Sequence, residues 1–382
     1  MNRTDITSKQ MQATIAMFFI GSTVIAGGEN SAKQDTWITI LIAVVLIIPM
    51  LWVHTKILQL YPGQSYYGNL IRALGRPVGL FVCSLYIFYT IHLGGQVIRT
   101  FSEFVHVVNM TETPVLAISG FILATLAYLL QKRLYVLTRI SRFVLPIVYF
   151  TVAMMVVLSY SSMHISNIKP MFQATPEELI KGVSIAFALP YGQVVACAPM
   201  MERMNRKEKI FPTFLKGTLL AFAILFAANI RNVLVLGYSA SVYAFPSYEA
   251  VSVVQLGTFF TRAEVLIGIN LMLAGFIKTG VLIFSSCNGL VKIFGFRDST
   301  PLIVPVSLVM LTMAMMVHRD TVEMFRWLGN YLDLFMLPFQ VFLPILVLLV
   351  GTLRKKFQKP QKKEKVPVKK EKRTAPVSPQ QS

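Results

Sequence analysis

The residues of this chain that are best suited to bind a ligand interrupt an apolar segment. Proline and glycine least favour a helix, yet Pro190 and Gly192 stand in a run without charged residues between Lys181 and Glu202. Inside a membrane, non-helical backbone is tolerated only where it is buried in protein or lines a cavity. Its freed N–H groups could bind a carboxylate and its carbonyls an ammonium, which is chemistry of recognition. The candidate binding residues of this segment are Leu189, Pro190, Tyr191, Gly192 and Gln193.

A second interruption lies near the N-terminus, where the sequence FFIGSTVIAGGEN places Gly21, Ser22 and Thr23 mid-way along an apolar run. Small residues there also suit close helix packing, and Pro190 also suits a simple proline kink. Interruptions at corresponding places in two halves of a chain are the better pointer to a transporter-type binding site. Tyr86 is a further candidate, because a deeply placed tyrosine needs a hydrogen-bond partner, although core packing also explains it.

Apolar segments long enough to cross a membrane repeat along the whole chain, which is 55% hydrophobic and 14% charged. A spanning helix needs about 20 mostly apolar residues. We therefore predict an all-α integral membrane protein in which spans one and six are broken at mid-membrane. If ten spans form two sets of five, the second set lies inverted in the membrane. The predicted spans are 11–28, 36–53, 77–98, 113–131, 143–168, 182–201, 211–238, 263–291, 299–317 and 334–353.

The distribution of basic residues predicts the orientation of these spans. With the N-terminus inside, 27 of the 36 Lys and Arg residues fall on the inner side and 6 on the outer side, as the positive-inside rule requires. We predict a cytoplasmic N-terminus (1–10), a membrane domain (11–353) with repeats 11–163 and 182–353, and a basic cytoplasmic tail (354–382). The tail is Lys- and Pro-rich, which is typical of disorder near anionic lipid or of a partner-binding segment.

In this topology, charged residues lie within or beside the predicted spans at three places. Lys278 lies about 21–24 Å from either membrane interface at ~1.5 Å per residue, too deep for its side chain to reach water. We expect it to point at the broken first span, to replace an ion or carry a proton there, or to form a structural pair. Arg99 and Glu103 are spaced to pair on one helix face. Arg231, in the outer part of its span, could extend its side chain to the interface.

Other function classes find little support. The cysteines lie in three separate spans, and the five histidines are scattered without metal-ligand spacing, so no metal or other cofactor is expected. Nucleophile elbows, zinc-protease motifs and nucleotide loops are missing, and nothing indicates an enzyme. The net charge of +19 reflects the inner loops and tail, so it indicates a lipid bilayer as partner and no nucleic acid.

Motifs in a fixed order carry a family resemblance over nearly all of residues 5–355. The chain resembles the B subunit of spore germinant receptors, in the spore germination permease family of the amino acid–polyamine–cation permease superfamily. The motifs are ITSKQMQ, SAKQDTWITILI, YPGQSYYGNLIRALGRPVG, ISNIKPMF, ALPYGQ, FPSYEAVSVV, RAEVLIGINLMLAGFIKTG and FGFRDSTPLIVPVSLVML.

The resemblance implies a ten-helix, leucine-transporter-type fold with two inverted five-helix repeats. It implies a nutrient sensor in the spore inner membrane that binds an amino acid or another small germinant at residues 21–23 and 189–192. The implied partners are a membrane A subunit and a lipoprotein C subunit. Many family members carry glutamate at the position of Gln193 and an acidic residue at that of Thr261, so these departures bear on proton coupling and ligand choice. An amino acid permease is the main alternative, and an ion channel a minor one.

Overall fold

The computed structural model describes most of the membrane domain. The described residues are 6–21, 23, 31–108, 110–205, 208–241, 243, 245–252 and 265–357. Ser22, Thr261 and most of the predicted tail lie outside them. Within the described ranges the chain is built from helices, and the one β-bridge joins Ile6 to Met204. The all-α prediction is confirmed for these residues.

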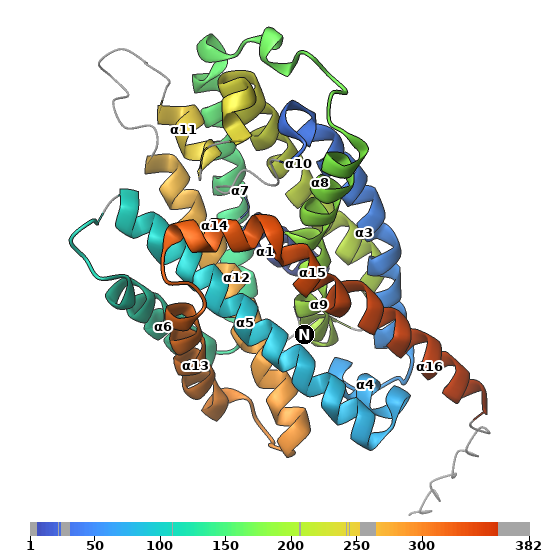
Figure 1. Ribbon diagram of the computed structural model, residues 1–382. Coiled ribbons are helices and arrows are strands. Elements are labelled where there is room, and N and C mark those ends of the chain that lie inside the picture. The colour runs from blue at the N-terminus through green and yellow to red at the C-terminus, as the bar shows by residue number, and fades with distance from the viewer. Residues whose placement is uncertain are drawn as a thin grey trace, which may run out of the picture.

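The helices form one bundle in which segments from both halves of the sequence interleave (Figure 1). α1 packs against α7, α10 and α12, α5 packs against α12 and α13, and α3 packs against α8. The α-helices are α1 (Ser8–Ile20), α3 (Thr36–Gln59), α4 (Tyr66–Leu74), α5 (Arg76–Val108), α6 (Val115–Gln131), α7 (Leu134–Leu158), α8 (Pro176–Ala188), α9 (Val194–Cys197), α10 (Ile210–Leu236), α11 (Pro246–Ser252), α12 (Val265–Phe294), α13 (Ile303–Met316), α14 (Thr321–Asn330), α15 (Leu332–Leu337) and α16 (Leu343–Phe357).

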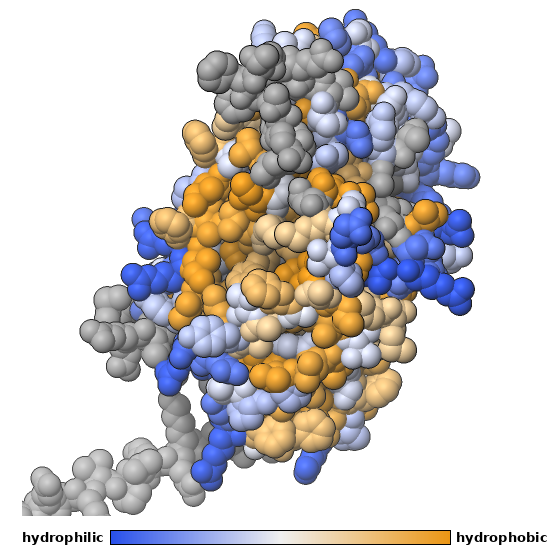
Figure 2. Space-filling view, turned by 90° about the vertical axis from the view of Figure 1, so that its left-hand side faces the viewer, coloured by the Kyte–Doolittle hydropathy of each residue, from blue (hydrophilic) through white to orange (hydrophobic). Residues whose placement is uncertain are grey.

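Seven helical segments are long and apolar enough to cross a membrane, and Val115–Gln131 and Thr300–Met316 are shorter apolar helices. Each predicted span overlaps one of these segments or, for the first span, α1. Hydrophobic residues cover the middle of the face in Figure 2, with hydrophilic residues toward its margins. These features are those of a multi-pass membrane protein; the count of ten spans and the inverted repeats remain predictions.

Local sequence explains where the two interrupted helices begin. Thr7 caps α1 and Gln10 returns a hydrogen bond to the cap, while Thr175 and Glu178 form the same reciprocal cap at the start of α8. Such pairs satisfy the free N–H groups of a first helical turn. Pro176 occupies the first position of α8, where its missing N–H costs nothing. Both interrupted segments therefore start at defined residues.

The predicted bounds of the fifth span are wrong at both ends. The span was expected over 143–168, but α7 covers Leu134–Leu158 and short 3₁₀ turns follow, Tyr160–Ser162 and Ile165–Ile168. This stretch lacks charge, but it is rich in serine and asparagine, which bond to nearby backbone and favour turns. Asn167 donates to the carbonyl of Leu234, near the end of α10. Absence of charge therefore extended the predicted helix too far.

The loop before α8 is tied to the segment before α3. Asp35 is buried, and its carboxylate accepts hydrogen bonds from the N–H groups of Phe172, Gln173 and Ala174 at 2.8, 2.8 and 3.0 Å. Nearby, Lys33 pairs with Glu178 at 2.7 Å. Charge-assisted bonds of this kind fix a loop in one position, so the start of α8 is held against the start of α3.

Candidate functional site

The helix that begins at Pro176 is interrupted where the sequence predicts. α8 ends at Ala188, Leu189 has an extended backbone (φ −131°, ψ 105°), and a 3₁₀ turn covers Tyr191–Gln193 before the short α9. Proline cannot donate a helical hydrogen bond and clashes with the preceding turn, which explains why α8 stops here. The side chain of Leu189 is half-buried and that of Tyr191 is fully buried.

A residue from the C-terminal helix satisfies the backbone that this break exposes. Gln340 lies in a π-helical turn, Pro338–Phe342, and its Nε2 donates to the carbonyl of Ala188 at 2.9 Å and to the Tyr89 hydroxyl at 3.0 Å. A Cβ at Gly192 would collide with the Gln340 amide. Gly192 is therefore needed for close approach, and π-turns often mark functional sites. Sequence reasoning missed Gln340; a glutamine inside the apolar span 334–353 was the available signal.

The end of α1 lies where the first interruption was predicted. α1 ends at Ile20, and Gly21 follows with φ 19° and ψ −122°. Thr23 is described and buried, while Ser22 and residues 24–30 lie outside the described residues. Most of the second half of the predicted span 11–28 therefore lies outside the described residues.

Lys278 does point at the end of α1, as expected. Its side chain is 0% exposed, its carbon stem packs where a Cβ at Gly21 would stand, and its Nζ lies 5.5 Å from the centre of the Phe18 ring. Among the described residues, no group accepts a hydrogen bond from that Nζ. The contact with Gly21 is established, whereas a role in ion replacement or proton transfer stays a prediction.

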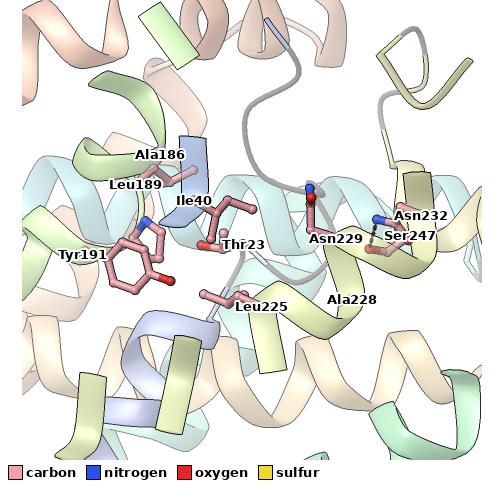
Figure 3. A pocket seen from close by; sticks show the side chains of 11 residues that line it. Thr23, Ile40, Ala186, Leu189, Tyr191, Leu225, Ala228, Asn229, Asn232 and Ser247 are labelled. Atoms are coloured by element: carbon pink, nitrogen blue, oxygen red, sulfur yellow. Dashed lines mark hydrogen bonds between the residues drawn. The ribbon is translucent and has the colours of Figure 1, made fainter. Parts of the chain in front are cut away.

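A small pocket joins the break in α8 to the end of α1 (Figure 3). Its volume of about 20 Å³ is close to the room that one water molecule needs, so an amino acid does not fit unless side chains move. Four predicted site residues are among those lining it. The lining residues are Thr23, Ile40, Ala186, Leu189, Pro190, Tyr191, Leu225, Ala228, Asn229, Asn232 and Ser247.

The two ends of this pocket differ in chemistry. Figure 3 shows Leu189 and Tyr191 at one end and the polar side chains of Asn229, Asn232 and Ser247 at the other, with Ile40 and Leu225 between them. Sequence reasoning missed the polar end. Two asparagines three residues apart inside an apolar helix were the signal, because intramembrane polar residues face the bundle interior.

The expectation that Arg231 extends to the interface is wrong. The side chain is 2% exposed, and its Nη2 donates to Asn232 Oδ1 at 2.6 Å and to the Ser247 carbonyl at 3.3 Å. Its Nη1 lies 3.5 Å from Met155 Sδ. The face of α10 that carries Arg231 packs against α7 and α11, so neutral protein groups solvate the guanidinium in place of water.

Several buried polar atoms beside the break lack partners. Thr23 Oγ1, the Tyr191 hydroxyl, and both amide atoms of Gln193 have no hydrogen-bond partner among the described residues. An unsatisfied buried polar group costs about 1–3 kcal/mol. Tyr191 and Thr23 line the pocket, whereas Gln193 is buried outside its lining. These atoms are the available donors and acceptors for a ligand near the break.

Tyr86 does not line the pocket. Its hydroxyl donates to the carbonyl of Phe339 at 3.2 Å, in the same π-turn that carries Gln340. Together Tyr86 and Tyr89 fasten α5 to that turn. The structure therefore assigns Tyr86 to the support of the break rather than to the pocket wall.

Arg99 and Glu103 form the predicted pair, at 2.6 Å and almost fully buried. Arg99 also donates to the Arg319 carbonyl at 3.1 Å, beside His318 in the loop after α13. Burial lowers the pKa of His318, the Arg99 charge lowers it further, and Glu323 acts in the opposite direction. Among the described residues, no group of three His, Cys, Asp or Glu side chains is arranged to hold a metal ion.

Comparison with known proteins places this architecture in a family. A family model described as spore germination protein matches residues 5–322. The chain belongs to the spore germination protein family. This match covers both interrupted helices and Lys278, so the pocket lies within the family's shared region.

Individual relatives are distant. The spore germination protein KB of Bacillus subtilis (strain 168) is 22% identical over 369 residues, covering 95% of this chain and 99% of the relative. The spore germination protein YndE of the same organism is 26% identical over 188 residues, 46% of this chain and 51% of the relative. Members of this spore germination family are named as germination proteins, not as enzymes.

A transporter shares the fold. The nucleobase-cation-symport-1 family transporter Mhp1, solved in a closed conformation with bromovinylhydantoin bound, superposes with a TM-score of 0.54 at 11% identity. The superposition covers 93% of this chain and 94% of the transporter. This chain, a member of the spore germination protein family, therefore has a transporter-like, multi-pass membrane fold.

Proposed function

We propose that this chain is the membrane subunit of a spore germinant receptor that binds a small nutrient germinant, an amino acid, in the mid-membrane pocket. Binding triggers germination through partner subunits, a membrane A subunit and a lipoprotein C subunit. The family membership and the full-length similarity to germination protein KB support this proposal. The ten-span inverted repeat, the inner-membrane location and the cytoplasmic termini belong to the same proposal.

One observation supports the proposal: a pocket connects the break after α8 with Thr23, just beyond the end of α1. Thr23 and Tyr191 bring hydroxyl groups to it from the two interrupted segments. Pockets at interrupted membrane helices suit small polar ligands, because unwound backbone and side-chain hydroxyls replace the ligand's water shell. The volume of about 20 Å³ means that side chains shift to admit a germinant, and that shift can be passed on to partner subunits.

A thermal-shift screen of the purified full chain against amino acids, sugars and nucleosides tests the proposal. A ligand that prefers the folded state raises its apparent stability. Ala228→Leu fills the pocket and should abolish the shift, whereas Ala223→Leu changes an exposed position of the same helix and should leave it intact. If no class of small molecule stabilises the chain, or if Ala228→Leu binds normally, the pocket is not a germinant site.

An amino acid permease is the second candidate, favoured by the full-length likeness to a solved transporter. Both functions use the same pocket, so binding alone does not separate them. Uptake of a labelled, pocket-binding amino acid into vesicles that hold this chain alone does. A receptor subunit binds without saturable uptake; robust, saturable uptake that Ala228→Leu removes establishes a permease.

Within the proposed receptor, Lys278 brings its side-chain amino group to the end of α1. Its stem passes Gly21 and its Nζ lies over Phe18, which places this group where it can steady the end of α1 or exchange a proton. Lys278→Met should abolish the ligand response at normal protein level. An unchanged response would remove Lys278 from the mechanism.

Gln193 is proposed to select by hydrogen bonds rather than by charge. Both of its amide atoms are buried without partners among the described residues, so either a ligand or a rearranged break can use them. Gln193→Glu should alter ligand preference and make binding pH-dependent. Binding that keeps its preference and its pH profile would argue against this role.

A further inference from the structure

The polar end of the pocket has a defined direction of hydrogen bonding. Arginine carries only N–H donors, so the Asn232 atom that faces Arg231 Nη2 at 2.6 Å must be the amide oxygen. The Asn232 amide NH₂ then faces Ser247 Oγ, at 2.9 Å. The guanidinium therefore determines the orientation of an amide that is otherwise ambiguous.

This orientation leaves the Ser247 hydroxyl as a donor. Ser247 Oγ already accepts from Asn232 Nδ2, and its own hydrogen has no acceptor among the described residues. Ser247 is 2% exposed and lines the pocket beside Asn229 (Figure 3). A buried hydroxyl that lines a pocket and already accepts one hydrogen bond can donate its own hydrogen to an acceptor group on a ligand.

The charge behind this donor selects among acceptors. Arg231 remains ionised, and its partners in the described part of the chain are an amide oxygen, a carbonyl and a thioether, all neutral. A buried cation without a carboxylate beside it favours an anion nearby. The guanidinium polarises the aligned hydrogen bonds from Arg231 through Asn232 to Ser247, which makes the Ser247 hydroxyl a stronger donor.

The broken helix offers less to an anion than its sequence suggests. The N–H of Gln193 donates to the Pro190 carbonyl at 3.3 Å, and the N–H of Val194 donates to the Tyr191 carbonyl. These N–H groups are therefore already used by the 3₁₀ turn. On the far side of the pocket, the Ser247 hydroxyl has a hydrogen with no acceptor among the described residues.

We propose that the pocket holds its ligand by a carboxylate at Ser247, with Arg231 as the positioning charge behind it. The remainder of the ligand is small and aliphatic, because Ile40, Leu225 and Ala228 line the space toward the break. The germinant class is thus an aliphatic amino acid with its carboxylate toward α10 and α11 and its ammonium toward the Tyr191 and Thr23 hydroxyls. This inference rests on the proposed function, since it concerns the same pocket.

The test compares L-alanine, L-valine and L-leucine with their uncharged-carboxyl analogues, the amino acid amides, by thermal shift and Kd on the purified full chain. The acid should bind at least about tenfold more tightly than its amide, as expected for a hydrogen bond to a charged group. Ser247→Ala should lose about tenfold for the acid and little for the amide. Ser252→Ala, an exposed serine of the same helix, is the matched control.

A second variant keeps the proposal testable if Ser247→Ala alters folding. Arg231→Gln retains an N–H donor for Asn232 but removes the charge, so the ratio of acid to amide affinity should fall toward one. Equal binding of acid and amide to the native chain overturns the inference, as does a pocket ligand without a carboxylate, such as a nucleoside. Both results leave germinant binding in this pocket standing, although a nucleoside ligand would replace the amino acid as germinant. Loss of every ligand response defeats the proposed function itself.

Discussion

Two buried cations of the bundle, Arg231 and Lys278, are accommodated in opposite ways. Arg231 of α10 makes three contacts with neutral polar atoms, and its fork holds Asn232 and Ser247 in place. Lys278 of α12 makes no hydrogen bond with the described residues, and its stem slides past Gly21 to place the ammonium over Phe18. The planar guanidinium of Arg231 is hydrogen-bonded by fixed neutral groups. The compact ammonium of Lys278, on a flexible stem, remains available for a hydrogen bond to another group.

This difference separates a structural cation from a responsive one. Arg231 orders one end of the pocket, so removing it should disturb the fold. Lys278 stands beside an interrupted helix without a fixed partner, so removing it should disturb the response more than the fold. Arg99 is a third case, because its charge is compensated directly by Glu103 at 2.6 Å.

The largest effect is expected from Arg231→Met. The substitution orphans Asn232 Oδ1 and the Ser247 carbonyl, each of which costs about 1–3 kcal/mol when unsatisfied, so a net loss of about 2–3 kcal/mol is expected. Chemical unfolding in detergent micelles measures it. Arg139→Met, at an exposed position of α7, is the control, and equal stability of the two variants would erase the contrast between the buried cations.

A loss of about 2 kcal/mol is expected for Gly21→Ala, because the added Cβ meets the Lys278 stem and lies 2.9 Å from the Phe18 carbonyl. Shortening the lysine should restore part of the loss, since neighbouring sites couple. The double variant Gly21→Ala with Lys278→Ala, compared with both single variants, measures that coupling. Additive effects would show that Lys278 does not press on the end of α1.

A smaller change of opposite sign is expected for Lys278→Met alone. Replacing a buried charge by an apolar side chain of similar length is often stabilising, here by about 1 kcal/mol. The melting temperature of the purified chain should therefore stay level or rise. A large fall would mean that the Lys278 ammonium is held as firmly as the Arg231 guanidinium.

The smallest expected effect on stability comes from His318, which precedes the Arg319 carbonyl that Arg99 contacts. Burial lowers the pKa of His318 below its ordinary value of 6.5, so the unfolded chain binds this proton more readily than the folded chain. Stability is then full above pH 6.5 and declines as the pH falls toward the folded-state pKa. His318→Gln should flatten this part of the stability curve between pH 7 and 5. An unchanged slope would assign the decline to other groups.

The sequence predicted the features that depend on local preference. Hydropathy located the apolar segments, because hydrocarbon excludes charge over a fixed length of helix. Pro190, Gly192 and Gly21 located the interruptions, since proline and glycine are the residue types that least favour a helix. The spacing of Arg99 and Glu103 predicted their pair, which one helical turn brings together.

Only the tertiary structure decided which partners complete the interruptions. Gln340 reaches the Ala188 carbonyl across 152 positions of sequence, and Ser247 meets Asn232 across 15 positions. Arg231 was misjudged because depth along a helix says nothing about which face is buried, and that face is set by packing against α7 and α11. Local residue preference determines where a helix breaks. The hydrogen-bond donors that satisfy the exposed backbone come from residues distant in sequence, so only tertiary packing decides which they are.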